Sequence, residues 1–245
     1  MTAIAALPTA VPRAVDVVAL TTVRRRAVFA TPLLIVAAVF VVTAILSLAL
    51  QRFLGSGDAE ALDGARQNPA IAWALSGFVV ALGVQGAATA FPLSLALGAT
   101  RRVFTLGTLL TNLVIAAYFT GMFLALLGIE LLTGHWFADI HLVDVYLLGA
   151  GDVRLMLPIV FLGTLTLLCI GSVFGASHVR FGAVGPSLLG LGSGLVLAIA
   201  LLVGAPALSA VFAAFQLWWL VVAAVALVLA SAAGILGFLR SASVR

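Results

Sequence analysis

The sequence predicts an all-α integral membrane protein with six transmembrane helices, and three observations carry that prediction. First, 64% of the 245 residues are hydrophobic and 8% are charged, which leaves too little polar surface to coat a water-soluble globule. Second, the chain contains six apolar runs, and about 20 such residues cross a bilayer. Third, no regular alternation of strand length indicates a barrel. We therefore expect a single transmembrane domain, 1–245.

Arginine positions set the expected orientation, because positively charged loops are retained on the cytoplasmic side of a membrane. If the six runs are spans, nine arginines and Asp16 fall inside, whereas three arginines and seven acidic residues fall outside. The net charge is then +8 inside and −4 outside, in agreement with the total of +4. We expect both termini in the cytoplasm of a multi-pass protein of the plasma (cytoplasmic) membrane, the cell inner membrane.

The segment 13–27 precedes the first span and carries arginines at both of its ends. Apolar residues flanked by arginine are typical of a helix that lies in the headgroup region, so we expect an N-terminal interfacial helix. The alternative is a plain cytosolic extension of the first span. A signal peptide is not expected, because the cluster Arg24 to Arg26 comes late and a long apolar run follows it.

Turn and charge signals bound the first three spans. The first span follows the arginine cluster and ends before an acidic, glycine-rich loop at 52–69. Pro92 lies near the inner end of the second span, where a missing backbone donor tends to end or kink a helix. Thr100 is a suitable N-cap for the third. These spans are expected at about 28–50, 71–91 and 103–127.

One long and two short connections separate the remaining spans. The segment 133–154 is the longest polar stretch, and its Trp136 and Tyr146 suit an outer membrane interface. A short inner loop carries Arg180, and Pro206 marks an outer turn. These spans are expected at about 155–174, 185–203 and 215–238.

The residues that are missing exclude several kinds of chemistry. All twelve basic residues are arginine, so the chain has neither the P-loop lysine that binds nucleotide phosphates nor a lysine nucleophile. We expect no enzymatic activity, no cofactor and no metal in the chain itself. The arginines are spread over loops that flank the membrane, so lipids are an expected partner and nucleic acid is not.

Mildly polar residues lie within the second and third spans. Gln85, Thr89, Asn112 and Tyr118 are candidates for a substrate path, and the alternative is that they form hydrogen bonds between helices. The spans hold no acidic residue unless Glu130 dips inward, which argues against a proton-driven carrier.

The outer segment and two glycine pairs each allow two interpretations. His135, Asp139, His141 and Asp144 have metal-ligating side chains, but a simple polar loop is the preferred interpretation. Glycines four residues apart let helix backbones approach closely, either within the bundle or at a dimer seam. The pairs are Gly171 with Gly175 and Gly190 with Gly194.

Two inner segments carry a family resemblance. They are Leu-Gly-Ala-Thr-Arg-Arg-Val-Phe at 97–104 and Val-Arg-Phe-Gly-Ala-Val-Gly at 179–185. Together with six spans and an N-terminal interfacial helix, they resemble the small membrane subunits of type-2 ABC exporters, especially actinobacterial ones. The resemblance implies a permease that exports an unidentified drug-like, lipid or peptide substrate. A separate cytosolic ABC ATPase subunit would bind ATP and Mg²⁺ and hydrolyse the ATP.

The resemblance also implies that a short coupling helix between the second and third spans enters a cleft of the ATPase. The residues that would make this contact are Gly98, Thr100, Arg101, Arg102 and Phe104. The alternative is that both arginines set topology and contact lipid phosphate. A second copy of the chain, or a related permease, would complete the transport path. The long outer segment 133–154 departs from a minimal hairpin.

Two other classes of protein are compatible with the same spans. One is a non-transporting immunity or sensor protein, which needs no contact with an ATPase. The other is the substrate-binding subunit of an uptake carrier, which needs a specific polar site within the bundle.

Overall fold

The expected helical membrane architecture is present. The computed structural model describes residues 13–23, 26–54, 64, 66–213, 216 and 218–240, and no strand occurs among them. Six helices in this part of the chain are long and apolar enough to cross a membrane. The orientation of the termini and the identity of the membrane stay predictions. The elements are α1 (Ala14–Thr22), η1 (Arg26–Ala30), α2 (Thr31–Leu54), α4 (Ala70–Ala96), α5 (Arg101–Leu132), η2 (His135–Asp139), η3 (Tyr146–Leu148), α6 (Val153–Phe181), α7 (Val184–Ala213) and α8 (Trp218–Arg240).

Several helices are longer than the spans expected from the sequence. The longest, α5, has 32 residues. At 1.5 Å per residue it measures about 48 Å, whereas the hydrocarbon core of a bilayer is about 30 Å thick. Hydropathy locates the part of a helix that lies in lipid, so the charged and polar turns at each end extend beyond the predicted bounds.

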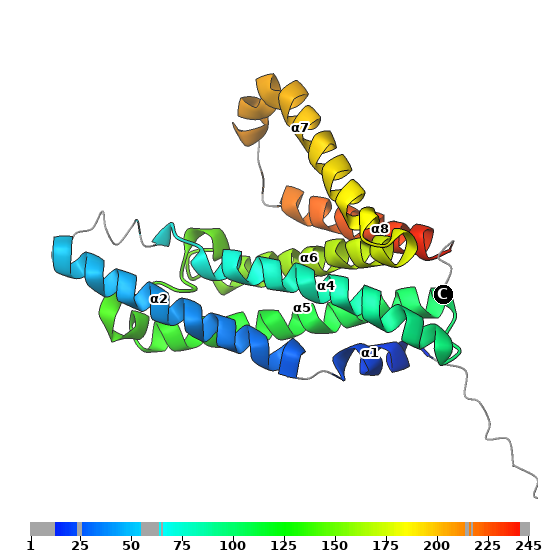
Figure 1. Cartoon of the computed structure of the whole chain (residues 1–245). Coiled ribbons are helices and arrows are strands. Elements are labelled where there is room, and N and C mark those ends of the chain that lie inside the picture. Colours follow the sequence, from blue (N-terminus) through cyan, green and yellow to red (C-terminus); the bar gives the residue numbers. More distant parts are fainter. Residues whose placement is uncertain are drawn as a thin grey trace, which may run out of the picture.

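Three helices, α4, α5 and α6, lie side by side at the centre of the bundle (Figure 1). The helices α1 and α2 follow one another along one side, and α8 packs on α6. In contrast, α7 contacts α6 near its own start and then stands away from the other helices. No described residue of α7 outside its first turn is buried, so its apolar surface is available to lipid or to another protein.

Glycines explain why α4 and α6 pack so closely. A methyl group added at Gly171 would overlap the carbonyl oxygen of Val80, and one added at Gly175 would overlap that of Val84. The packing interpretation of this pair is therefore correct. On α7, a methyl group at Gly194 would meet no described atom within 4 Å, so the pair on that helix makes no such contact here.

Glu130 anchors the outer segment to the end of α5. The side chain is 0% exposed, although the sequence places it just beyond the span. Its Oε1 accepts hydrogen bonds from the backbone N–H groups of Leu142 and Asp144, and its Oε2 accepts one from Val143. Hydrogen bonds to a carboxylate are stronger than those between neutral groups, so one buried side chain holds the loop in place.

Candidate functional site: a recess between α1, α4 and α5

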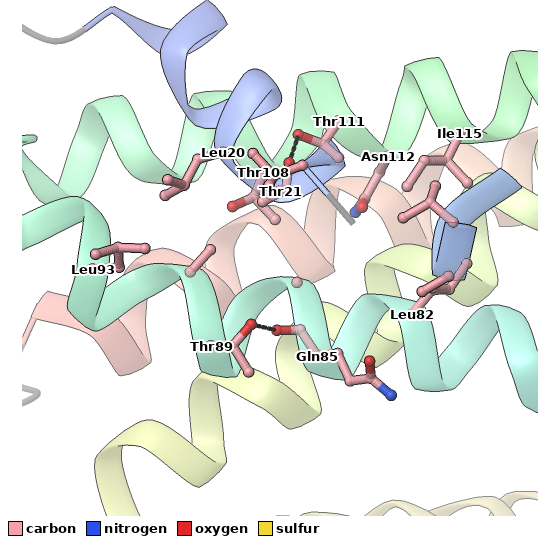
Figure 2. Close-up of a pocket in the computed structure, with 15 residues that line it drawn as sticks. Leu20, Thr21, Leu82, Gln85, Thr89, Leu93, Thr108, Thr111, Asn112 and Ile115 are labelled. Carbon is pink, nitrogen blue, oxygen red and sulfur yellow. Dashed lines mark hydrogen bonds between the residues drawn. The ribbon is translucent and has the colours of Figure 1, made fainter. Parts of the chain in front are cut away.

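Three helices enclose a recess of about 310 Å³. Its wall is mostly apolar and carries a few hydroxyl and amide groups (Figure 2). None of the described residues that line it is ionisable. The lining residues are Leu20, Thr21, Val23, Ala27, Val28, Leu82, Gln85, Gly86, Thr89, Ala90, Leu93, Thr108, Thr111, Asn112 and Ile115.

One wall of the recess comes from α1, which packs along the first turns of α5. The bare backbone of Gly107 admits Val17, whose side chain is 2% exposed. One turn further along both helices, the hydroxyl groups of Thr21 and Thr111 lie 3.0 Å apart (Figure 2). The two contacts show that α1 runs beside α5 in the same direction. This alignment favours the alternative of an extension of the first span, and the interfacial position stays a prediction.

Three of the four residues predicted for a substrate path line the recess. On α4, the hydroxyl group of Thr89 donates to the carbonyl oxygen of Gln85 at 2.7 Å, and both side chains are exposed. On α5, the amide nitrogen of Asn112 donates to Ser172 Oγ at 3.2 Å. Asn112 therefore contributes to the recess wall and also makes the interhelical hydrogen bond that the alternative describes.

Tyr118, the fourth predicted residue, lies outside the recess. Its hydroxyl group donates to the backbone oxygen of Phe29 at 2.7 Å. The two rings meet edge to face with their centroids 4.9 Å apart. Tyr118 therefore joins α5 to η1, and its geometry favours the role of an interhelical tie.

Sequence reasoning missed three polar residues of the recess, namely Thr21, Thr108 and Thr111. Thr108, Thr111 and Asn112 stand at i, i+3 and i+4, so helical spacing places them on one face of α5. That spacing was a usable signal. Thr21 had none, because its position depends on α1 packing against Gly107, which is distant in the sequence.

The inner connection between α4 and α5 is a tight turn at 97–100. The expectation of a separate coupling helix is wrong, since this segment holds no helix. Gly98 has a φ of +87°, and its N–H donates to the Leu95 carbonyl oxygen at 2.9 Å, which closes α4. The side chain of Thr100 accepts from the Val103 N–H at 3.2 Å and starts α5, so the predicted N-cap is confirmed. One cap follows the other directly, which leaves no residues for a helix between them.

Two of the predicted contact residues face the inside of the protein. Arg101 Nη1 donates to the backbone oxygens of Leu239, at 2.6 Å, and of Arg240, at the end of α8. Phe104 is 0% exposed and packs edge to face on Phe91 at 5.1 Å. These side chains stabilise the inner end of the bundle and offer no free surface to a partner.

An outward surface remains at this turn. Gly98, Thr100 and Arg102 are exposed, and the neighbouring Leu97 is 62% exposed. Leu93, one turn before Leu97 on α4, lines the recess. The turn therefore joins the two helices that form opposite walls of the recess.

Comparisons of the chain with family models, with curated proteins and with solved structures find no match. The function is therefore inferred from the recess, from the turn and from the motif resemblance.

Proposed function

We propose that the chain is the membrane permease subunit of an ABC exporter, powered by ATP that a separate subunit hydrolyses. The observation that carries this proposal is the position of the turn at 97–100, which joins the helices on either side of the recess. A rigid element that two packed helices share transmits a tilt to both of them. A partner that moved the turn would therefore move the walls of the recess.

The lining of the recess supports an amphiphilic substrate. Apolar walls with a few polar groups favour a ligand that has a large apolar body and few hydrogen-bonding groups. The recess is small, since binding sites for drug-sized molecules measure about 300–1,000 Å³. We propose that one chain supplies part of the path and that a second copy, or a related permease, supplies the rest.

The partner ATPase would contact the outward surface of the turn. Leu97 would supply an apolar anchor, and the guanidinium group of Arg102 would pair with a carboxylate of the ATPase. Arg101 and Phe104 are left out of this contact because both already have partners within the chain. The exposed face of α7, with Gly190 and Gly194, is the proposed seam with the second membrane subunit.

Hydrolysis by the purified complex tests the proposal. The tagged chain would be expressed in its source organism, purified in a mild detergent and assayed for vanadate-sensitive ATP hydrolysis per mole of chain. We expect the wild type to carry this activity and the double variant Leu97→Asp/Arg102→Glu to lose it. The matched control is Arg154→Glu, a charge reversal at an exposed arginine of the opposite end.

The outcome also separates the alternatives. A wild-type chain that purifies without vanadate-sensitive hydrolysis would contradict the proposal and favour an immunity or sensor protein. Hydrolysis that survives in the double variant would mean that the turn is not the coupling contact.

A further inference from the structure

The outer segment folds back on α5 and brings together three side chains that can bind a metal ion. They are Glu130 from α5, His135 from η2 and His141 from the loop that follows η2. One ligand atom from each lies within 4.8 Å of the others. Glu130 is fully buried, His141 is 9% exposed, and His135 is open enough to admit an ion from solution.

Asp144 orients both imidazole rings. Its Oδ2 lies 3.0 Å from Nε2 of His135 and 3.4 Å from Nδ1 of His141. Each ring therefore directs one nitrogen at this carboxylate and keeps the other nitrogen for a ligand. Histidines that bind a metal are commonly held in this way, with a carboxylate on the second nitrogen.

Unpaired polar atoms at the same place point to a missing ligand. Nδ1 of His141 and Oδ1 of Asp144 are shielded from solvent, and neither makes a hydrogen bond in the described part of the chain. Buried polar atoms in folded proteins nearly always have a partner, so this pair requires an explanation. A metal ion that drew the rings together would change the position of both groups.

The charges of the cluster favour a cation. Arg66 Nη2 lies 2.7 Å from Asp144 Oδ2 and neutralises one of the two carboxylates. With neutral histidines, the carboxylate of Glu130 leaves a net negative charge in a buried place. Burial and the neighbouring His135 lower the pKa of His141, so its imidazole is held in the neutral form that binds metals.

We propose that Glu130, His135 and His141 bind one divalent transition metal ion, zinc in particular, at the outer end of the bundle. Two imidazoles and one carboxylate form a recognised zinc ligand set that keeps a fourth position open for water. Oε2 of Glu130 accepts a single hydrogen bond and therefore retains a lone pair for the ion. The ion fastens the outer loop to α5.

Sequence reasoning considered the wrong fourth member for this group. It considered Asp139 with the two histidines, but Asp139 is exposed and Glu130 takes its place. In tetrahedral zinc sites the ligand atoms are about 3.4 Å apart, so binding requires the histidines to move closer to Glu130. This inference does not depend on the proposed transport function.

Zinc content and thermal stability test the proposal. The full chain, freed of its affinity tag, would be purified in detergent, stripped with EDTA and dialysed against micromolar Zn²⁺. We expect about one zinc per chain and a rise in melting temperature that Mg²⁺ does not produce. His135→Gln and His141→Gln should each lose most of the zinc, whereas His178→Gln, at an exposed histidine of the opposite end, should keep it.

Cobalt supplies a second readout that does not depend on stability. Co²⁺ at a tetrahedral site with nitrogen and oxygen ligands gives strong visible absorption, which His135→Gln should abolish even if His141→Gln fails to fold. The proposal is overturned if the wild type binds well below one zinc per chain. It is also overturned if His135→Gln binds zinc and cobalt as the wild type does.

Discussion

Arg101, at the first turn of α5, donates a hydrogen bond to the backbone oxygen of Leu239 at the last turn of α8, with the two atoms 2.6 Å apart. The last carbonyl groups of a helix have no partner within it, and a cation satisfies them well. One arginine of the resembling motif therefore has a structural role inside the chain. The neighbouring Arg102 is exposed and is the one available to a partner.

The first prediction separates these two arginines. Arg101→Ala removes hydrogen bonds from a charged donor, so we expect it to lower the stability of the purified chain by about 1–3 kcal/mol. Arg102→Ala should leave stability nearly unchanged and weaken hydrolysis by the complex. Melting temperatures in detergent test the difference. Equal losses of stability in both variants would contradict the assignment.

The second prediction concerns the close contact between α4 and α6. Gly171→Ala places a methyl group against the Val80 carbonyl oxygen, so the helices must separate, at a cost of about 1–3 kcal/mol. Gly163→Ala is a matched control on the same helix, because a methyl group there meets no described atom within 4 Å. Its melting temperature should stay level or rise slightly, since alanine favours a helix.

The third prediction concerns the carboxylate that anchors the outer loop. Glu130→Gln replaces a charged acceptor of backbone N–H bonds with a neutral amide, and we expect a loss of about 2 kcal/mol. Hydrogen exchange of the amides of Leu142, Val143 and Asp144 should become faster. The control is Asp139→Asn, at an exposed residue of the same segment. Unchanged exchange in Glu130→Gln would show that the anchor is dispensable.

The fourth prediction is that acid loosens the outer loop when EDTA keeps the chain free of metal. Burial raises the pKa of Asp144, but hydrogen bonds from His135 and Arg66 outweigh it and leave this pKa below its ordinary value. The pKa of His141 is also lowered, chiefly by burial. In both cases the unfolded chain binds more protons than the folded one, so stability is present at neutral pH and declines as the pH falls.

Melting temperatures between pH 7.5 and pH 4 measure this effect. The decline should begin below the ordinary pKa of histidine, about 6.5, and continue towards the pKa of Asp144. His141→Gln should flatten the first part of the curve and keep the second. A melting temperature that is constant over this range would contradict the assigned directions.

The sequence was sufficient to predict the helices but not all of their contacts. Apolar runs and arginine positions predict six membrane helices, and Thr100 predicts where one of them starts. Gln85, Thr89 and Asn112 could be selected because polar side chains are conspicuous within apolar spans. Hydropathy reports how each segment partitions into lipid and says nothing about which segments meet, so the packing of α1 on Gly107 could not be predicted.

Burial changed the interpretation of two further residues. Phe104 follows two arginines in a short basic segment, which suggested an exposed position, but helical geometry turns it towards Phe91 and into the bundle. Glu130 lies at the end of a span, which suggested an outer interface, but the loop after η2 folds over it. Both outcomes depend on contacts between residues whose pairing the sequence pattern does not specify.

The distance across the recess, from α1 to α4, tests the central claim most directly. Spin labels would replace Leu20 and Leu93, two lining residues, in a chain whose Cys169 is changed to Ser, within the complex that carries ATPase activity. We predict that ATP with vanadate shifts the electron–electron distance distribution and that Arg102→Glu abolishes the shift. A distribution that is the same with and without nucleotide in the wild type would contradict the claim that the turn moves the walls of the recess.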